Sequence, residues 1–373
     1  MRILWYNWRD IKNPEAGGAE VLTHEISTRL IKKYRHDITL FTSKFNGASR
    51  HEYIDGVHVI REGGRYTVYE KAKAYYKGNR DSYELIIDEI NVKPFLTPKY
   101  VKKEKPILAL IHQISPEQFI YELPFPLSIL GRYYLERKWL SYYKDIPTVT
   151  VSRSTMAELE KIGIQNIFLV PEGLGISPLT ALAVKETVPT IVFIGRLKKH
   201  KLPHHAIQAF MLIKNEIPAA KLWVIGDGYM RKQLEGLGAK DTKFYGHIDN
   251  TQKYEFLRRA HLVLMPGIRE GWGLVVTEAN AMGTPVVAYD IPGLRDSVRD
   301  GSSGILVKEN TPIGLASSAI SLLRNAALLD KLSLKALAFS RQFSWERSAD
   351  IFNQIIDKVA DGGQQRKEVP KDY

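Results

Sequence analysis

Short apolar runs alternate with longer amphipathic segments along the whole chain. Six runs in the first half have the length and composition of strands: residues 2–6, 37–42, 57–61, 84–89, 107–112 and 148–152. A second series of six follows: residues 190–195, 220–228, 242–248, 262–266, 285–290 and 303–307. Strands separated by helical segments are typical of parallel sheets covered by helices, so the pattern predicts two α/β domains in series.

The segments between these runs predict helices, because their apolar residues recur with the helical period. The clearest are residues 19–34, 203–217, 251–260 and 311–329, the last expected as a single helix. A shorter helix is predicted at 274–282, where Thr284 and Pro285 end the apolar run. The final segment, 345–361, has an apolar helical face formed by Trp345, Ile351, Phe352, Ile355, Ile356 and Val359.

Prolines and glycines gather between Pro171 and Pro189, where the strand and helix pattern is interrupted. This break predicts an N-terminal domain at 1–175, a linker at 176–189, a C-terminal domain at 190–344, a helix at 345–361 and a polar tail, expected to be disordered, at 362–373. We expect two doubly wound domains that face each other across a cleft. Open parallel sheets bind ligands beyond the carboxyl ends of their strands, so the predicted site lies there.

Composition limits the kinds of molecule that the protein is expected to bind. The 373 residues are 44% apolar, enough for two cores, and the formal charge of +12 predicts attraction to nucleic acid, a lipid surface or a phosphorylated substrate. Zinc-finger spacings and RNP-like aromatic motifs are absent from the sequence, so nucleic acid is not expected as a partner. The chain has no cysteine, which excludes disulfides and thiolate metal sites and is compatible with a reducing compartment.

Two carboxylates mark the stretch from residue 266 to residue 288. Glu270 falls in a predicted loop, and Glu278 falls about one turn into the predicted helix. The glycines in this loop free the backbone where the helix begins, so three amides are expected to face an anion there: those of Trp272, Gly273 and Leu274. The simpler alternative is a solvated loop acid and a helix acid favoured by the helix dipole.

Basic and small residues follow other predicted strands. Arg196 and Lys201 come just after the strand at 190–195, where an arginine fork and a lysine point charge suit a diphosphate. Gly17 and Gly18 precede the helix at 19–34 and would let a ligand phosphate or hydroxyl approach the backbone. His112 ends a strand, where it would donate to a sugar hydroxyl or lie as a satisfied buried imidazole. Ordinary surface basicity and a flexible loop are the alternatives for the first two features.

These motifs together resemble a known family. The pattern G-R-L-x-x-x-K at 195–201, then V-I-G-D-G, Y-G-H-I and E-G-W-G-L with a second Glu eight positions after the first, is similar to the C-terminal domain of retaining GT-B glycosyltransferases of family 4. The resemblance extends to "GGAE" at 17–20, "IH" at 111–112, "VSRST" at 151–155 and "FSWERSADIF" at 343–352. It implies a GT-B fold, a last helix that crosses back to the N-terminal domain, and transfer of a hexose-type sugar from a nucleotide-diphosphate sugar.

The resemblance also assigns roles. Glu270 would contact hydroxyls of the donor sugar, Glu278 would hold the ribose, and His112 would lie near the sugar. The implied catalytic residues are His112, Arg196, Lys201 and Glu270. The implied donor-binding residues are Gly17, Gly18, Arg196, Lys201, Gly246, Ile248, Glu270, Trp272, Gly273, Leu274 and Glu278. The sequence departs from the family at Leu202, where a glycine is usual, and at Glu172, where an asparagine is usual.

Cofactor and metal requirements follow from charge. The leaving nucleoside diphosphate gains negative charge in the transition state, and fixed Arg and Lys donors stabilise it more than the ground state. No metal and no cofactor other than the donor substrate is therefore expected, and no Asp-x-Asp motif is placed to hold a cation. Two alternatives remain open: a GT-B epimerase or phosphorylase, and a non-catalytic nucleotide-sugar binding protein. The complete set of motifs disfavours both.

The acceptor side is marked by residues 115–145, where aromatic and basic side chains alternate. The set includes Phe119, Tyr121, Phe125, Tyr133, Tyr134 and Trp139 with Arg132, Arg137, Lys138 and Lys144. Such a surface suits an anionic membrane carrying a polyprenyl-phosphate-linked acceptor, and a domain core with bases reaching outward fits equally well. The expected location is cytoplasmic, with peripheral binding to the inner face of the membrane, and the acceptor is a glycan or a lipid-linked sugar.

Overall fold

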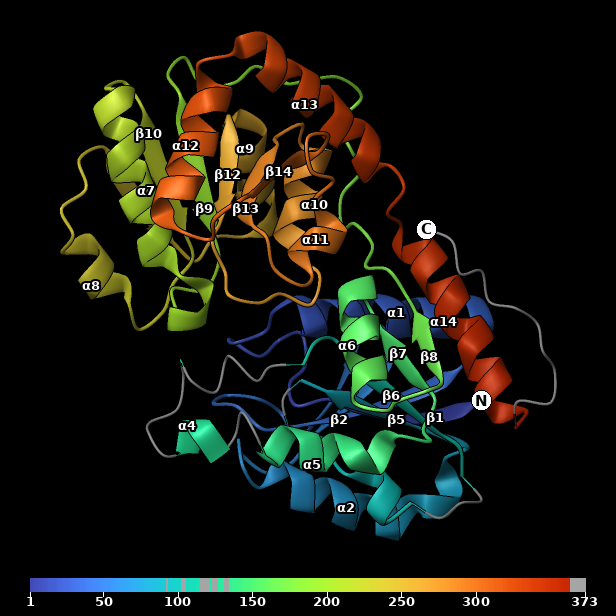
Figure 1. Cartoon of the computed structure of the whole chain (residues 1–373). Coiled ribbons are helices and arrows are strands. Elements are labelled where there is room, and N and C mark those ends of the chain that lie inside the picture. Colours follow the sequence, from blue (N-terminus) through green and yellow to red (C-terminus); the bar gives the residue numbers. More distant parts are fainter. Residues whose placement is uncertain (92, 102–104, 115–120, 122–126, 131–133, 363–373) are drawn as a thin grey trace. The chain divides into compact units, whose positions relative to one another are not determined.

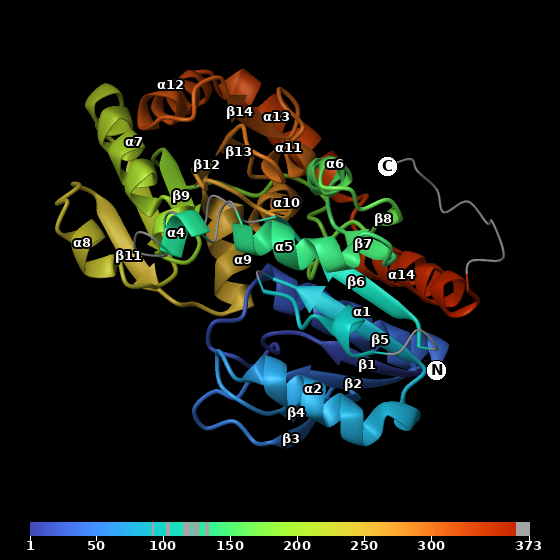
Figure 2. The same ribbon diagram turned by 60° about the horizontal axis from the view of Figure 1, so that its bottom comes forward.

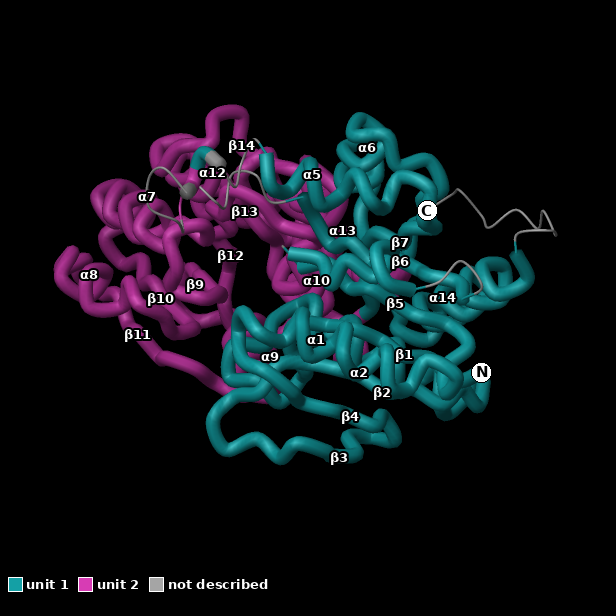
Figure 3. Tube along the Cα trace, turned by 90° about the horizontal axis from the view of Figure 1, so that it is seen from below, with its two compact units in different colours: residues 1–116, 129–173, 344–373 teal, residues 117–128, 174–343 magenta. Residues whose placement is uncertain are grey.

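The computed structural model describes residues 1–373 except 92, 102–104, 115–120, 122–126, 131–133 and 363–373. The expected polar tail, apart from Gly362, therefore lies outside the described residues. The chain forms two compact units (Figure 3): unit 1 contains residues 1–116, 129–173 and 344–373, and unit 2 contains residues 117–128 and 174–343. The long passage of the chain through unit 2 begins after Gly173 and ends at Phe343, and residues 117–128 are a second, short segment of that unit.

Unit 1 is built on a sheet of eight strands in the order β3-β4-β2-β1-β5-β6-β7-β8. The strands are β1 Arg2–Tyr6, β2 Asp37–Thr42, β3 His51–Ile54, β4 Val57–Arg61, β5 Leu85–Ile90, β6 Ile107–Ile111, β7 Thr148–Thr150 and β8 Ile167–Leu169. All neighbouring pairs are parallel except β3 and β4. The six strands predicted in this half are confirmed. The pattern did not reveal β3, which carries exposed side chains, or β8, which has only three residues.

Helices cover both faces of this sheet. They are α1 Gly18–Tyr34, α2 Val68–Asn79, α5 Glu136–Leu140, α6 Arg153–Lys161 and α14 Trp345–Ala360, with short 3-10 turns η1 Arg80–Ser82, η2 Thr97–Lys99 and η4 Ser141–Tyr143. The short helix α4 Leu127–Leu130 contains residues assigned to both units. The helices α1 and α14 pack against each other on one face (Figure 1). The helices α2 and α5 lie on the opposite face (Figure 2).

The last helix confirms the expected return of the chain to the N-terminal domain. Ser344 begins α14 by accepting a hydrogen bond from the amide of Arg347, and the apolar face of the helix is buried in unit 1. Phe352 stacks on Trp5 of β1, with ring centroids 5.3 Å apart and planes 8° from parallel. Burying an aromatic or branched side chain contributes about 1.5–3 kcal/mol, so this face is a main source of the stability of unit 1.

Unit 2 contains a six-stranded parallel sheet in the order β11-β10-β9-β12-β13-β14. The strands are β9 Thr190–Ile194, β10 Lys221–Ile225, β11 Thr242–Gly246, β12 Leu262–Met265, β13 Val286–Tyr289 and β14 Gly304–Val307. The helical elements are η5 Lys199–Lys201, α7 Pro203–Glu216, α8 Arg231–Glu235, α9 Asn250–Arg259, α10 Leu274–Ala281, α11 Leu294–Ser297, α12 Pro312–Leu323 and α13 Ala326–Ser340. The helix α12 packs on α7, whereas α13 packs on α10. The predicted doubly wound parallel sheet of the second domain is confirmed.

One helix prediction in unit 2 is wrong. Residues 311–329 form not one helix but the end-to-end pair α12 and α13, bent by 102° at Arg324 and Asn325. The side chain of Asn325 accepts a hydrogen bond from the amide of Leu328 and so begins α13. Among the described residues no single helix is long and apolar enough to cross a membrane, and this bent pair passes that test only by length and composition.

The segment predicted as a linker, 176–189, is part of unit 2. The amide of Leu179 donates to the carbonyl of Ala281 at 2.9 Å, and that of Glu186 donates to the carbonyl of Arg259 at 3.0 Å. The side-chain nitrogen of Lys185 lies within hydrogen-bonding distance of three oxygens at the ends of α9 and α10: the carbonyls of Arg258 and Gly283 and the hydroxyl of Thr284, at 2.7–3.1 Å. The segment is therefore fastened along unit 2.

The aromatic and basic stretch 115–145 contains both core and surface side chains. Phe119, Phe125, Arg132 and Tyr133 lie outside the described residues. Of the described aromatics, Tyr143 is fully buried, whereas Tyr121 and Tyr134 are 39% and 54% exposed. Arg137 and Lys138 are exposed beside Tyr134. The described part of the stretch therefore contributes to the core through η4 and to the surface ahead of and along α5.

Candidate active site

The loop after β9 carries the first pair of predicted donor-binding residues. Arg196 follows Gly195 directly, and Lys201 ends the turn η5. This loop packs against the Gly226–Gly228 loop after β10, where a side-chain carbon on Gly226 would lie 2.1 Å from the carbonyl oxygen of Gly195. Glycine is required there, which explains the V-I-G-D-G motif and fixes the backbone that carries Arg196. Leu202, which stands where the family has glycine, retains a left-handed backbone with φ of 49°.

Lys201 and Glu270 form a close ion pair. Their Nζ and Oε1 atoms are 2.5 Å apart, and their side chains are 21% and 10% exposed. The loop that carries Glu270 follows β12, and its Ile268 amide donates to the carbonyl of His200 at 3.0 Å, which ties the two loops together. The structure thus brings together a predicted phosphate-binding cation and a predicted sugar-binding carboxylate at the carboxyl edge of the sheet.

Glu278 has two partners that the sequence did not indicate. Lys253 of α9 donates to its Oε1 atom at 2.7 Å, and the hydroxyl of Tyr254 lies 3.4 Å from the same oxygen. Glu278 is 7% exposed, as expected for a residue inside α10. A single lysine on an amphipathic helix carries no distinctive sequence signal, because most such lysines are solvated.

The loop between these carboxylates begins α10. Gly273 precedes the helix with φ of +88°, and the helix runs from Leu274. The ring of Trp272 packs edge-on against Phe343, with centroids 5.4 Å apart, and its buried indole nitrogen has no hydrogen-bond partner among the described residues. A side-chain carbon on Gly293 would lie 2.1 Å from the carbonyl oxygen of Glu270, so this contact also requires glycine.

Gly246 and Ile248 lie at the end of β11, in the same sheet edge. Gly246 is buried with φ of +71°, and its carbonyl accepts from the amide of Gly226 at 2.7 Å. Asp249 then begins α9 by accepting from the amide of Gln252. The helix that follows carries Lys253 to Glu278, so the predicted base-binding loop and the predicted ribose-binding acid are connected through α9.

The remaining predicted residues belong to unit 1. His112 follows β6 and is 6% exposed, and its Nε2 lies 2.8 Å from Oε1 of Glu89 in β5. The other oxygen of Glu89 accepts from Trp5 Nε1 at 2.8 Å and from Thr23 Oγ1 at 2.5 Å. Glu89 thus holds His112 in one orientation with a proton on Nε2. The sequence showed Glu89 only as the end of an apolar strand.

Charges around His112 favour its protonated form. Burial alone would lower the pKa of His112, but the hydrogen bond and charge of Glu89, with the charges of Glu172 and Glu20, raise it above the ordinary value for histidine. Burial raises the pKa of Glu89 in turn. Glu172, which replaces the family's usual asparagine, therefore acts on His112 electrostatically within unit 1.

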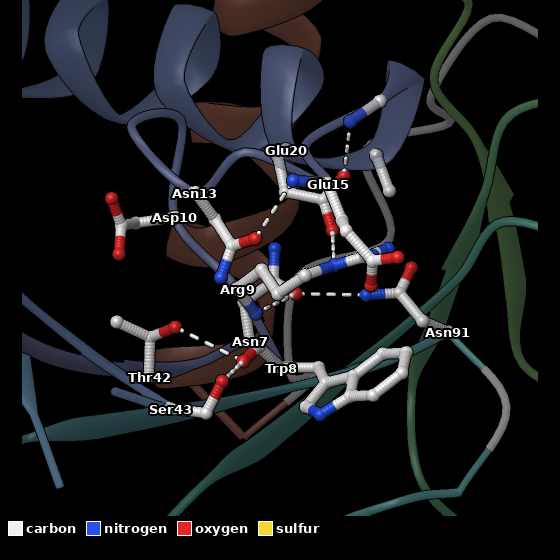
Figure 4. Close-up of polar contacts among 12 residues, drawn as sticks. Asn7, Trp8, Arg9, Asp10, Asn13, Glu15, Glu20, Thr42, Ser43 and Asn91 are labelled. Carbon is white, nitrogen blue, oxygen red and sulfur yellow. Dashed lines mark hydrogen bonds and ion pairs between the residues drawn. The ribbon is translucent and has the colours of Figure 1, made fainter. Parts of the chain in front are cut away.

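Gly17 and Gly18 begin α1. The amide of Gly17 donates to Oε2 of Glu20 at 2.6 Å, and Oε1 of Glu20 accepts from Nε of Arg9 at 3.0 Å (Figure 4). Gly18 is exposed. The amide of Gly17 is thus already hydrogen-bonded to the carboxylate of Glu20. The exposed backbone at the start of this helix is that of Gly18.

The charged residues of unit 2 described above can bind an anion next to a polyol. Lys201 and Arg196 supply positive charge, and the carboxylates of Glu270 and Glu278 are the groups that accept hydrogen bonds from sugar hydroxyls. Among the described residues no group of three or more His, Cys, Asp or Glu side chains is arranged to hold a metal ion.

Part of the sequence is similar to known proteins. Residues 180–338 match the family model described as Glycosyl transferases group 1. A glycogen synthase of Mycobacterium tuberculosis is 28% identical over 238 residues, which cover 61% of this chain and 57% of that protein. The chain thus matches a little over half the length of that relative.

Solved structures show the fold over nearly the whole chain. A sucrose-phosphate synthase from Thermosynechococcus elongatus superposes with a TM-score of 0.79 at 20% identity, covering 97% of this chain and 99% of that one. Anabaena HepE in complex with UDP and glucose gives a TM-score of 0.73 at 16% identity, covering 96% and 100%. The fold of this protein is GT-B.

Proposed function

We propose that this protein is a retaining glycosyltransferase that moves a hexose-type sugar from a nucleotide-diphosphate sugar to a glycan or a polyprenyl-phosphate-linked acceptor. The observation that carries the proposal is the pairing of Lys201 with Glu270 and of Lys253 with Glu278 at the carboxyl edge of the unit 2 sheet. This edge lies within the segment that matches the glycosyltransferase model. Parallel sheets bind nucleotides at this edge.

Each of the predicted site residues has a role in the proposed reaction. Arg196 and Lys201 neutralise the diphosphate, whose charge grows as the bond to the sugar breaks. Glu270 accepts hydrogen bonds from the sugar and Glu278 from the ribose, while the Gly246–Ile248 loop and the start of α10 at Trp272, Gly273 and Leu274 complete the donor site. The amides around Gly17 and Gly18 are proposed to reach the donor as well. His112, held by Glu89, donates to the transferred sugar.

The proposed reaction needs no metal ion and no cofactor beyond the donor. Arg196, Lys201 and the helix start supply the positive charge that a divalent cation supplies elsewhere. Turnover should therefore survive excess EDTA. Loss of activity on chelation that magnesium or manganese restores would contradict this part of the proposal.

A donor screen tests the proposal directly. A ligand at a hundred times its Kd raises the free energy of unfolding by about 2.7 kcal/mol, so the correct donor should raise the Tm when UDP-, GDP- and ADP-sugars are compared. The stabilising donor should then lose its sugar slowly to water or to an acceptor. Stabilisation without any sugar release would indicate a binding protein, and a changed sugar still attached to the nucleotide would indicate an epimerase.

The acceptor is proposed to be reached at the inner face of the membrane. Tyr121, Ile129 and Tyr134 are 39%, 48% and 54% exposed, and Arg137 and Lys138 lie exposed near them in the sequence. Each basic side chain near an anionic surface contributes about 1 kcal/mol, so binding should weaken as salt rises.

Flotation with liposomes tests the membrane proposal. Arg137→Glu/Lys138→Glu should float less than the wild type on anionic vesicles at low salt. Lys32→Glu/Lys161→Glu, which changes the net charge equally at exposed positions of α1 and α6, serves as the matched control. Failure of the wild type to float, or equal loss in both variants, would move the proposal to a soluble acceptor.

A further inference from the structure

Three loops bring aromatic and basic side chains to the carboxyl edge of the unit 1 sheet. Trp8 follows β1, Arg65 follows β4, and Lys93 follows β5. The strands β1, β2, β4 and β5 are mutually parallel, so their carboxyl ends share one edge. Together with Tyr69 at the start of α2, these three residues are called the Trp8 cluster. Ligands of open parallel sheets bind at such an edge.

The backbone of Trp8 is held firmly. Its carbonyl accepts three hydrogen bonds, from the amide and hydroxyl of Ser43 at 3.1 and 2.7 Å and from the hydroxyl of Thr42 at 3.1 Å (Figure 4). The neighbouring Asn7 accepts from Nδ2 of Asn91 at 2.8 Å, which joins the ends of β1 and β5. The half-buried indole ring therefore stands at a fixed position on the sheet edge.

Two guanidinium groups lie against the ring of Trp8, and they differ in their partners. That of Arg9 is 4.6 Å from the ring centroid, and it also pairs with Glu20 at 3.0 Å and with Glu15 at 3.4 Å. That of Arg65 is 5.5 Å from the ring, and Arg65 is exposed. Within the described part of the chain, no acidic side chain pairs with Arg65. Arg9 is thus a structural cation, whereas Arg65 is positioned without a counter-ion.

Lys93 is positioned in the same way. Its ammonium lies 4.2 Å from the ring centroid of Tyr69, and no carboxylate among the described residues pairs with it. Tyr69 packs on Phe95, with centroids 5.0 Å apart. Trp8 and Tyr69 pack against the same apolar core of unit 1, so the cations that lie over their two rings share one region of the sheet edge. Arg65 and Lys93 therefore belong to one cluster with two uncompensated charges.

We propose that the Trp8 cluster binds a phosphate group carried by the acceptor. The fork of Arg65 and the point charge of Lys93 match the oxygens of a phosphate, and the aromatic rings hold both cations in place before the ligand arrives. The phosphate belongs either to a soluble sugar phosphate or to a polyprenyl-phosphate lipid. This inference rests on the proposed function and names the chemical class of its acceptor.

The test follows the indole signal of Trp8 by NMR in the full chain, labelled with 15N-tryptophan and assigned with Trp8→Phe. Titration with sodium phosphate and with glucose 1-phosphate should shift this signal, whereas glucose, or sodium chloride at equal ionic strength, should not. Arg65→Ala/Lys93→Ala should weaken the apparent affinity at least tenfold. The matched control Lys32→Ala/Lys161→Ala should titrate like the wild type.

Several outcomes would overturn the proposal. These are an unmoved Trp8 signal, an equal shift with chloride, which would mean ionic screening only, and wild-type affinity in Arg65→Ala/Lys93→Ala. Lys201→Ala should leave the Trp8 titration unchanged because Lys201 lies in unit 2. The donor screen therefore reports failure of the proposed function, and the Trp8 titration reports failure of the present proposal. Flotation on phosphatidylcholine vesicles with and without polyprenyl phosphate distinguishes the two sources. If the phosphate belongs to a soluble acceptor, glucose 1-phosphate shifts the Trp8 signal but polyprenyl phosphate causes no flotation. If it belongs to a lipid, vesicles with polyprenyl phosphate float the wild type and do not float Arg65→Ala/Lys93→Ala.

Discussion

Lys201→Ala should lower both the turnover of the protein and its stability, for two separable reasons. Turnover falls because the ammonium stabilises charge that develops on the leaving diphosphate. Loss of one such transition-state donor costs about 10²-fold in kcat, or roughly 2.7 kcal/mol. Stability falls because Glu270, with a side chain only 10% exposed, loses the ion pair at 2.5 Å.

The stability cost follows from burial. Removing one partner of a fully buried ion pair costs about 3–5 kcal/mol, and leaving a single buried polar group unsatisfied costs about 1–3 kcal/mol. The lysine side chain is 21% exposed, so water can reach the carboxylate when it is truncated. We therefore expect a loss of about 1–2 kcal/mol in the free energy of unfolding for Lys201→Ala.

A double-mutant cycle separates the two effects. Lys201→Ala, Glu270→Gln and the double variant are compared by urea unfolding and by kcat with the donor found in the screen. Lys201→Ala/Glu270→Gln removes both charges, so it should regain most of the lost stability while kcat stays low. Wild-type kcat in Lys201→Ala, or restored kcat in the double variant, would show that Lys201 only neutralises Glu270 and would refute the role at the diphosphate.

Three further predictions concern other buried charges. Glu278→Ala should raise the Kd for the donor at least tenfold in a thermal-shift titration with little change in kcat, because Glu278 and its partner Lys253 lie where the ribose is proposed to bind; an unchanged Kd would contradict that position. Asp10→Ala should cost about 1.5–3 kcal/mol in urea unfolding, because Arg61 loses two buried hydrogen bonds at 2.8 and 2.9 Å but keeps its ion pair with Glu52; a loss under 1 kcal/mol would contradict it. Burial, aided by the nearby charge of Arg258, lowers the pKa of Lys185 to about 7 in the folded state. The unfolded state then binds more protons between pH 7 and about 10, so the wild type should gain stability relative to Lys185→Met as pH rises from 7 to 9, and a flat difference would contradict the assignment.

The sheets could be predicted from sequence because their strands are buried on both faces. Strands such as β1 and β9 appear as continuous apolar runs, and turn residues bound them. The antiparallel β3 could not be found this way, because its His51 and Tyr53 are exposed and the apolar content is low. The bend between α12 and α13 was missed because the apolar period continues through it. Asn325, the residue that begins α13, was the only local signal.

The carboxylates of the candidate site could be predicted from the sequence, but their partners could not. Glu270 and Glu278 could be identified because glycines whose positions allow no side chain lie near them. Their spacing within one short segment can be read from the sequence without knowing the fold. Their partners come from other segments: Lys253 is 25 positions from Glu278, and Glu89 is 23 positions from His112. Such pairs depend on which strand ends meet in the sheet, and hydrophobic periodicity contains no information about that.

The return of α14 to unit 1 affects how the protein is made. Trp5 leaves the ribosome long before Phe352, the ring on which it stacks, because the whole of 174–343 lies between them. The larger part of unit 2 runs from 174 to 343, and at a synthesis rate of roughly 20 residues per second unit 1 lacks one covering helix for about 8 s while that stretch is made. Through that interval the face of α1 and the indole that bonds Glu89 are exposed to chaperones and proteases. A chain stopped at residue 343 would stay in that vulnerable state permanently.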